Sequence, residues 1–172
     1  MKGITPTVAA IGQLPQVPHL QFAMEWFDHV TFENGKPHLQ AMTILADAIF
    51  WYSPVPVKDA ATGMIVGYER SFSDDLLQRS YSYYEERYGM STQQARTALD
   101  KLEALGVAWR VVKDVVEVGS KVLSNVMYID VNPQRIYEIS TPKAMRSITP
   151  LLYITDPSVI HNRRIQIKQY TE

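Results

Sequence analysis

The stretch from Ser80 to Arg110, which reads SYSYYEERYGMSTQQARTALDKLEALGVAWR, decides how this chain folds. Its first part predicts a short helix, because three tyrosines and a preceding leucine recur at helical spacing and so share one face. These residues are Leu77, Tyr81, Tyr84 and Tyr88. Gly89 follows, and glycine most easily takes the positive φ at which a chain leaves a helix.

A second helix is expected after this glycine, with the hydroxyl of Ser91 or Thr92 as its N-terminal cap. Its apolar side chains form one stripe at Ala95, Ala98, Leu99, Leu102 and Leu105. Gly106 ends this helix, and Val107-Ala108-Trp109 starts a strand. A helix, a glycine turn, a second helix and a strand in this order are typical of a winged helix-turn-helix. In that motif the second helix enters the major groove of DNA.

The segments before this stretch supply the remaining helix of such a domain. His38 to Tyr52 carries an apolar stripe and predicts a long helix, which Pro54 and Pro56 stop. Val57 to Ser71 is a long insertion that forms either a hairpin or an irregular loop. We expect the next helix to start at Asp74-Asp75, because carboxylates are favoured at a helix N-terminus.

The segments after the stretch predict a wing. Val107 to Val118 and Lys121 to Val131 are rich in Val, Ile and Tyr, and Gly119-Ser120 separates them, so they predict a β-hairpin. Asn132-Pro133 then opens a short helix that ends near Glu138.

These elements predict the α+β class and a winged helix-turn-helix with a three-helix core, a β-hairpin wing and an extension at each end. Residues 1–21 hold three prolines and two glycines without periodicity, which predicts an extended N-terminal arm. Residues 22–139 form the winged-helix domain. Residues 140–172 hold five basic and two acidic residues and form a basic C-terminal extension.

The charge of the chain weighs mildly against nucleic-acid binding. The formal net charge is -1, whereas DNA affinity depends largely on cations that neutralise phosphates. Residues 70–121 hold eight basic and eight acidic residues. Binding to DNA therefore requires that the acidic groups face away from the duplex, or that the basic extension adds contacts.

Other classes of protein find less support in the composition. The chain has no cysteine, and its four histidines lack the spacing of metal ligands, so we expect neither a metal nor a cofactor. It has no nucleophile motif, paired-carboxylate pattern or phosphate-binding glycine loop, so we do not expect an enzyme. No apolar run approaches the ~20 residues of a membrane span, and no signal peptide is evident. We therefore expect a cytoplasmic protein with no membrane partner.

The polar side of the second helix offers side chains suited to reading DNA. Glutamine can bond adenine and arginine can bond guanine in a bidentate manner, and threonine can contact a thymine methyl group or a phosphate. We expect base contacts from Thr92, Gln93, Gln94 and Thr97, and base or phosphate contacts from Arg96 and Lys101. The alternative is a solvated helix face that contacts no ligand.

The wing offers a second set of contacts, to phosphates or to the minor groove. Its members are Lys113, Ser120, Lys121 and Asn125. The alternative is a plain hairpin whose lysines serve solubility, with Asn125 satisfying a backbone group in the turn. We also expect Trp109 in the core, and Tyr83, which lies off the tyrosine stripe, with its hydroxyl near a phosphate.

Five segments between about His38 and Ile139 carry a resemblance to a known family: AIFWY, FSDDLLQRSY, YGMSTQQAR, ALDKLEALGV and LSNVMYIDVNP. They resemble the winged-helix replication initiators, or replisome organisers, of phages and plasmids. Transcription regulators share the helix-turn-helix part, whereas the wing return and the long insertion favour the replication group. The resemblance implies binding to origin DNA as a dimer or higher assembly, together with other replication proteins.

The sequence therefore predicts a homodimer that binds double-stranded DNA sequence-specifically, in replication initiation of a phage, plasmid or other mobile element. Two alternatives remain open. One is a transcriptional repressor with the same fold, and the other is a winged-helix module that binds protein instead of DNA.

Overall fold

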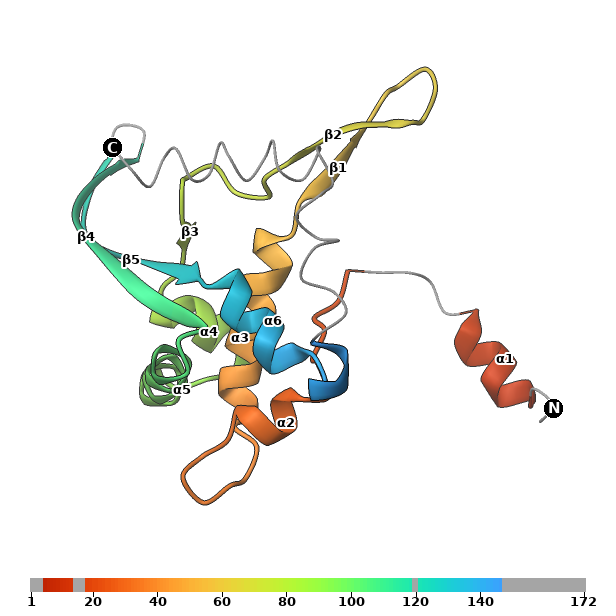
Figure 1. Cartoon of the computed structure of the whole chain (residues 1–172). Coiled ribbons are helices and arrows are strands. Elements are labelled where there is room, and N and C mark those ends of the chain that lie inside the picture. Colours follow the sequence, from red (N-terminus) through yellow and green to blue (C-terminus); the bar gives the residue numbers. More distant parts are fainter. Residues whose placement is uncertain (1–4, 14–17, 119–120, 147–172) are drawn as a thin grey trace.

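A computed structural model describes residues 5–13, 18–118 and 121–146 (Figure 1). The fold is mixed α+β, with helices packed on a small antiparallel sheet and a separate two-stranded hairpin. The helices are α1 (Pro6–Gly12), α2 (Trp26–His29), α3 (Leu39–Tyr52), α4 (Tyr81–Tyr88), α5 (Thr92–Ala104), α6 (Pro133–Ser140) and the 3-10 turn η1 (Lys143–Met145). The strands are β1 (Val55–Lys58), β2 (Ile65–Glu69), β3 (Leu77–Gln78), β4 (Ala108–Val118) and β5 (Lys121–Val131).

Helices α3 and α5 build the centre of the core. The predicted apolar stripe of α5 is fully buried at Ala95, Ala98, Leu99 and Leu102. It packs in one cluster with the buried side of α3, which includes Ala41, Ile44, Leu45 and Ala48. Each fully buried leucine stabilises the fold by about 1.5–3 kcal/mol, so this stripe fixes which side of α5 faces outward.

The three-stranded sheet has the order β3-β5-β4, and both pairings are antiparallel. Strands β4 and β5 form the long predicted hairpin, with Ala108 opposite Val131 and Val118 opposite Lys121. Helix α6 follows with Asn132 as its cap, as its sequence predicts. From α3 to β5, apart from the β1–β2 hairpin that follows α3, the order along the chain is α3, β3, α4, α5, β4 and β5.

The turn between α4 and α5 forms as the sequence predicts. Gly89 ends α4 with a φ of 66°. Ser91 then caps α5, and its hydroxyl accepts the N–H of Gln94 at 3.2 Å. In return, Oε1 of Gln94 accepts the N–H of Ser91 at 2.9 Å, which completes a capping box. This box holds the start of α5 in a fixed direction.

The predicted start of α4 at Asp74-Asp75 is wrong. Helix α4 begins at Tyr81, and Ser80 caps it by accepting the N–H of Tyr83 at 3.1 Å. Leu77, which shares the helical spacing of the tyrosines, lies instead in β3 opposite Ile129. Pairing with a strand distant in sequence has overridden a local helical pattern.

The long insertion forms a hairpin, which settles the alternative left open by the sequence. Strands β1 and β2 pair antiparallel, with Val55 opposite Glu69 and Val57 opposite Gly67. Figure 1 shows this hairpin projecting from the body, on the opposite side from α5.

The two ends of the chain differ in what the structure describes. The arm expected to be extended contains α1, because Thr5 accepts the N–H of Val8 and Pro6 occupies the first turn, where proline is favoured. At the other end, Ser140 accepts the indole N–H of Trp26 at 2.8 Å and ties α6 to α2. Most of the predicted basic extension, residues 147–172, lies outside the described residues.

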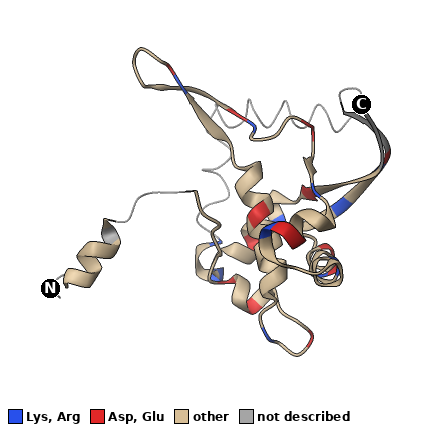
Figure 2. Ribbon diagram, turned by 180° about the vertical axis from the view of Figure 1, so that it is seen from behind, with Lys and Arg blue, Asp and Glu red and all other residues tan. Residues whose placement is uncertain are grey.

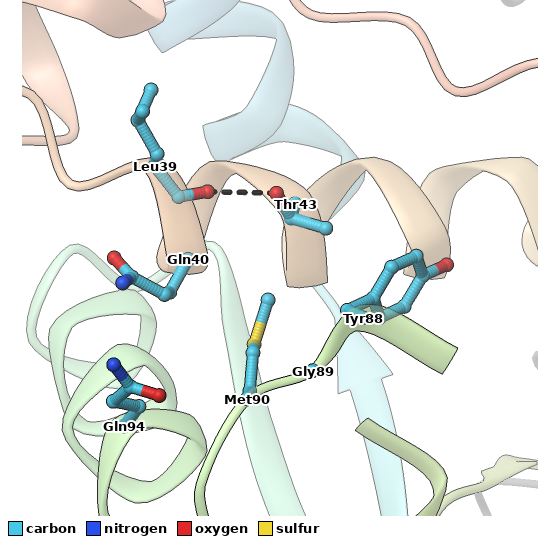
Figure 3. Close-up of a pocket in the computed structure, with 7 residues that line it drawn as sticks. All are labelled: Leu39, Gln40, Thr43, Tyr88, Gly89, Met90 and Gln94. Atoms are coloured by element: carbon cyan, nitrogen blue, oxygen red, sulfur yellow. Dashed lines mark hydrogen bonds between the residues drawn. The ribbon is translucent and has the colours of Figure 1, made fainter. Parts of the chain in front are cut away.

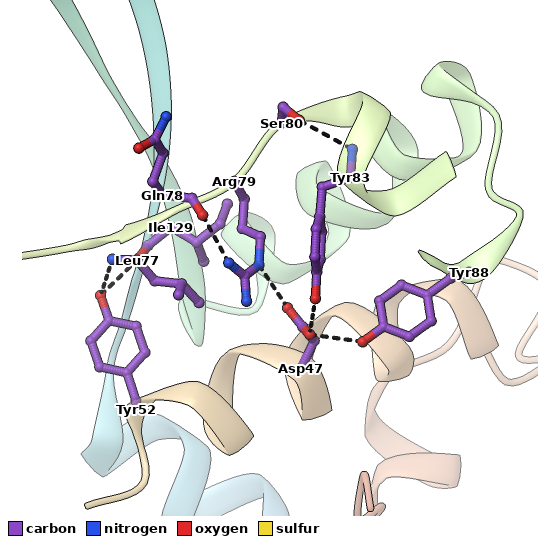
Figure 4. A network of polar contacts seen from close by, with 9 residues as sticks. All are labelled: Asp47, Tyr52, Leu77, Gln78, Arg79, Ser80, Tyr83, Tyr88 and Ile129. Atoms are coloured by element: carbon purple, nitrogen blue, oxygen red, sulfur yellow. Dashed lines mark hydrogen bonds and ion pairs between the residues drawn. The ribbon is translucent and has the colours of Figure 1, made fainter. Parts of the chain in front are cut away.

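A buried carboxylate on α3 joins three segments (Figure 4). Asp47 is 1% exposed, and it pairs with Nε of Arg79 at 3.0 Å. It also accepts the hydroxyls of Tyr83 at 2.8 Å and Tyr88 at 2.7 Å. Burial, and then the bond to Asp47, raises the pKa of Tyr83, so that hydroxyl stays protonated and remains a donor. We call Asp47, Arg79, Tyr83 and Tyr88 the Asp47 cluster.

Replacing Asp47 with Ala should lower the free energy of unfolding by about 3–5 kcal/mol, because it leaves the Arg79 guanidinium buried without its carboxylate. Tyr88→Phe removes one donor only and should lower it by about 1–2 kcal/mol. Urea denaturation followed by circular dichroism measures both. An Asp47→Ala variant as stable as Tyr88→Phe would contradict this account.

A second buried polar group sits at the start of α3. His38 is 3% exposed, its ring stacks on Phe32 with centroids 3.9 Å apart, and its Nδ1 accepts the N–H of Ala41 at 3.3 Å. This cap requires an unprotonated Nδ1. Burial, with a smaller contribution from the charge of Lys101, lowers the pKa of His38 below its ordinary value of 6.5.

Stability should therefore fall as the pH drops below about 6.5, because the unfolded chain then binds a proton at His38 that the native chain does not. The fall should level off below the lowered pKa of the folded state. His38→Asn keeps an oxygen cap but does not titrate, so the difference in unfolding free energy between about pH 7 and pH 5 should shrink. Equal pH dependence in both proteins would remove His38 as its cause.

Candidate nucleic-acid interface

The first turns of α5 present an open polar face. Thr92, Gln93, Arg96 and Thr97 are all exposed, while the opposite side of the helix is in the core. Nε2 of Gln93 lies 3.4 Å from the hydroxyl of Thr97, one turn further on. Among the described residues, no carboxylate lies on α5 before Asp100. This half of the helix is thus polar, exposed and free of negative charge, as its predicted role requires.

Gln94 is also exposed but is partly committed to the fold. Its Oε1 caps α5, so a bidentate bond to adenine would require the capping box to open. Its side chain lines an open hollow of about 310 Å³ between the start of α3 and the α4–α5 turn (Figure 3). The hollow is lined by Leu39, Gln40, Thr43, Tyr88, Gly89, Met90 and Gln94. The capping box thus occupies part of the hydrogen-bonding capacity of Gln94.

Arg96 is held over an aromatic ring. Its guanidinium carbon lies 5.6 Å from the ring centroid of Tyr81 on α4. The hydroxyl of Tyr81 in turn accepts from Nη1 of Arg110 at 3.2 Å. A cation over a tyrosine face is stabilised by about 0.5–1 kcal/mol at an exposed site. The ring limits the range of positions of Arg96 while leaving its outer edge exposed.

The second half of α5 carries two carboxylates that pair with one arginine of β4. Arg110 bonds Oε1 of Glu103 at 2.8 Å and also pairs with Asp100. Hydrogen bonds from Arg110 lower the pKa of Glu103, so this carboxylate stays ionised. Two carboxylates against one guanidinium leave one negative charge beside Lys101, which is half-buried. Contact with phosphate is therefore favoured at the start of α5 and disfavoured near its end.

The residues predicted to lie in a wing differ in how far the structure describes them. Nζ of Lys113 pairs with Asp75 at 2.9 Å and lies 4.5 Å from the ring centroid of Tyr128. The hydrogen bond that Lys113 donates to Asp75 raises the pKa of Lys113, which stays charged but already has a partner. Asn125 is exposed in the left-handed region, with a φ of 54°. Ser120 and the side chain of Lys121 lie outside the described residues.

Two aromatic residues take other places than predicted. Tyr83 was expected near phosphate, but its hydroxyl is bound to Asp47. Trp109 was expected in the core, and this is wrong, because its side chain is 36% exposed. The neighbouring Ala108 takes the buried position, and successive strand residues face opposite sides of a sheet.

Basic and acidic segments are interspersed along the ribbon of the body (Figure 2). The sequence did not reveal the partners of the charged residues on α5. Arg110, which bonds Glu103, comes from β4, and Tyr81, whose ring lies against Arg96, comes from α4. The available signal was Asp100 and Glu103 at a spacing of three, which places both on one helix face. Their partner becomes apparent only when the strand lies beside the helix.

Comparison with known proteins gives no further guide, since no family model, curated protein or solved structure matches this chain. Within the described residues, no group of three or more His, Asp or Glu is placed to hold a metal ion. No helix in the same part of the chain is long and apolar enough to cross a membrane.

If phosphate approaches α5, Asp100→Asn should tighten binding to any duplex by about two- to fivefold, since it removes an exposed negative charge from that face. Asp28→Asn makes the same change of charge on α2, away from this face, and should leave the affinity unchanged. Fluorescence anisotropy with a labelled duplex measures both. Equal effects of the two substitutions would mean that only the net charge matters.

Proposed function

We propose that this protein is a winged-helix protein that binds double-stranded DNA sequence-specifically, with α5 in the major groove and the β4–β5 hairpin as the wing. The order α3, β3, α4, α5, β4, β5 supports this proposal, as does the sheet order β3-β5-β4. In a winged helix two helices hold the third, recognition helix against the sheet, and the hairpin flanks it.

The observation that carries the proposal is the exposed, carboxylate-free face of α5 from Thr92 to Thr97. Its backbone is fixed by the Ser91–Gln94 capping box, and Arg96 is guided by Tyr81. Thr92, Gln93 and Arg96 offer both donors and acceptors, which base edges in the major groove can match. A fixed helix that shows such groups to solvent is suited to reading a sequence.

The charge pattern predicts how strongly this surface binds. Lys113 and Arg110 already have carboxylate partners, so few cations near α5 remain available for phosphates. Because each phosphate contact adds about one to the slope of log affinity against log salt, a shallow slope is expected. Sequence-specific contacts then account for an unusually large share of the affinity.

We place this activity in replication initiation of a phage, plasmid or other mobile element, on the strength of the five segments that resemble such initiators. A selection from random duplexes at stated salt tests DNA binding directly. Enrichment of one sequence supports the proposal. A failure to enrich any duplex would refute it and favour a winged helix that binds protein.

On the selected site, Arg96→Ala should weaken binding by about 1–3 kcal/mol and relax the preference at one base position. Lys58→Ala is the matched control, because it removes one exposed positive charge from β1, in the hairpin that projects away from α5 (Figure 1). It should change binding little. Anisotropy titrations of both variants on the selected and a scrambled duplex make the comparison. Equal losses would remove α5 from the interface.

A further inference from the structure

The β1–β2 hairpin exposes an unusual amount of apolar surface. Met64, Ile65 and Val66 are 68%, 52% and 67% exposed, and Val55 and Val57 also face solvent. A two-stranded hairpin alone is marginally stable in water, and contiguous exposed apolar groups mark interaction surfaces. Nothing in the DNA-binding proposal uses this hairpin, since it projects on the opposite side from α5 (Figure 1).

The two outer edges of this hairpin are chemically different. Strand β1 contains Pro56, which has no N–H to donate, and Pro54 precedes the strand. Proline on an edge strand discourages further pairing. Strand β2 reads Ile65-Val66-Gly67-Tyr68-Glu69, without proline, and within the described part of the chain it pairs with β1 alone. One edge is thus closed to another strand and the other is open.

We propose that β2 pairs antiparallel with β2 of a second copy of this chain, joining two hairpins into a four-stranded sheet across a two-fold axis at Gly67. This pairing places Val66 opposite the partner's Tyr68, and an aromatic residue opposite a β-branched one is a favourable cross-strand pair. Ile65 lies opposite the partner's Glu69, so the two Glu69 carboxylates are at opposite ends of the ladder. A parallel pairing would bring them together.

Two further features favour a second copy as the occupant. Gly67 has no positive φ, and a Cβ built on it meets no atom within 4 Å, so the hairpin itself does not require glycine there. Glycine inside a strand often marks a place where another backbone approaches. The formal net charge of -1 also leaves little repulsion between copies. Closed two-fold dimers are the commonest assemblies of soluble proteins.

Disulfide cross-linking tests the pairing, because the chain has no cysteine of its own. Gly67→Cys places two thiols across the proposed axis and should give a covalent dimer under mild oxidation, without DNA. Met24→Cys puts a thiol at a position that is 76% exposed elsewhere and is the control. Ile65→Cys mixed with Glu69→Cys should cross-link more than either variant alone, which fixes the register. Cross-linking of Gly67→Cys no faster than the control would overturn the proposal.

A second variant covers the case in which Gly67→Cys does not fold. Val66→Lys adds a charge on the open edge of β2 and should weaken dimerisation at least about tenfold in sedimentation velocity. Met24→Lys adds the same charge on another exposed apolar residue and should not. A wild-type chain that stays monomeric up to about 100 μM, above the Kd range of specific dimers, also overturns it. These measurements contain no DNA, so their failure leaves the DNA-binding proposal untouched.

Discussion

The structure depends on one buried carboxylate more than on any other polar group. Asp47 lies in the middle of α3, and its partners come from the residue after β3 and from both halves of α4. A buried charge is tolerated only when it is paired and hydrogen-bonded, so these segments must all be in place together. Arg79 also lies 4.2 Å from the ring centroid of Tyr83 and 5.3 Å from that of Trp51, which adds directional contacts around the ion pair. Apolar packing alone would let α4 slide on α3, whereas this cluster specifies one position.

The position of α4 then determines what α5 can show. Gly89 and the Ser91 cap leave little freedom between the two helices, so fixing α4 fixes the start of α5 as well. Tyr81, half-buried at the start of α4, carries Arg96 over its ring and accepts a hydrogen bond from Arg110 at its hydroxyl. Different residues of one short helix thus hold the core and organise the candidate interface. A loss of order at Asp47 would reach Arg96 without any direct contact between them.

Sequence reasoning succeeds here where structure is local and fails where it is not. Helices α3 and α5, the Gly89 turn and the β4–β5 hairpin follow from periodicity and caps. The helical pattern wrongly included Leu77, because its spacing from Tyr81 fits a helix, whereas Leu77 lies in β3 and pairs with Ile129 in β5. The prolines and glycines of residues 1–21 predict an extended arm, although a proline such as Pro6 after a threonine cap also starts helices. The hydroxyl of Tyr83 donates a hydrogen bond to Asp47, which lies 36 residues earlier, and no local sequence pattern predicts that contact. On α5 the sequence indicated which face is exposed, but the pairing of Asp100, Glu103 and Lys113 required the fold.

The proposals of DNA binding through α5 and dimerisation through β2 together account for the near-neutral charge and the exposed apolar hairpin. A single copy of a chain with few cations available for phosphates binds DNA weakly, because phosphate contacts usually supply much of the affinity. In two copies joined by their β1–β2 hairpins, binding of the second copy to DNA would be an intramolecular event. Such coupling raises overall affinity for DNA by factors of about 10²–10⁴ without any new contact to DNA, provided that both copies can reach their half-sites. The hairpin projects away from α5, so pairing there would leave α5 uncovered in both copies. A protein built in this way would avoid most random DNA as a monomer and hold a paired site as a dimer.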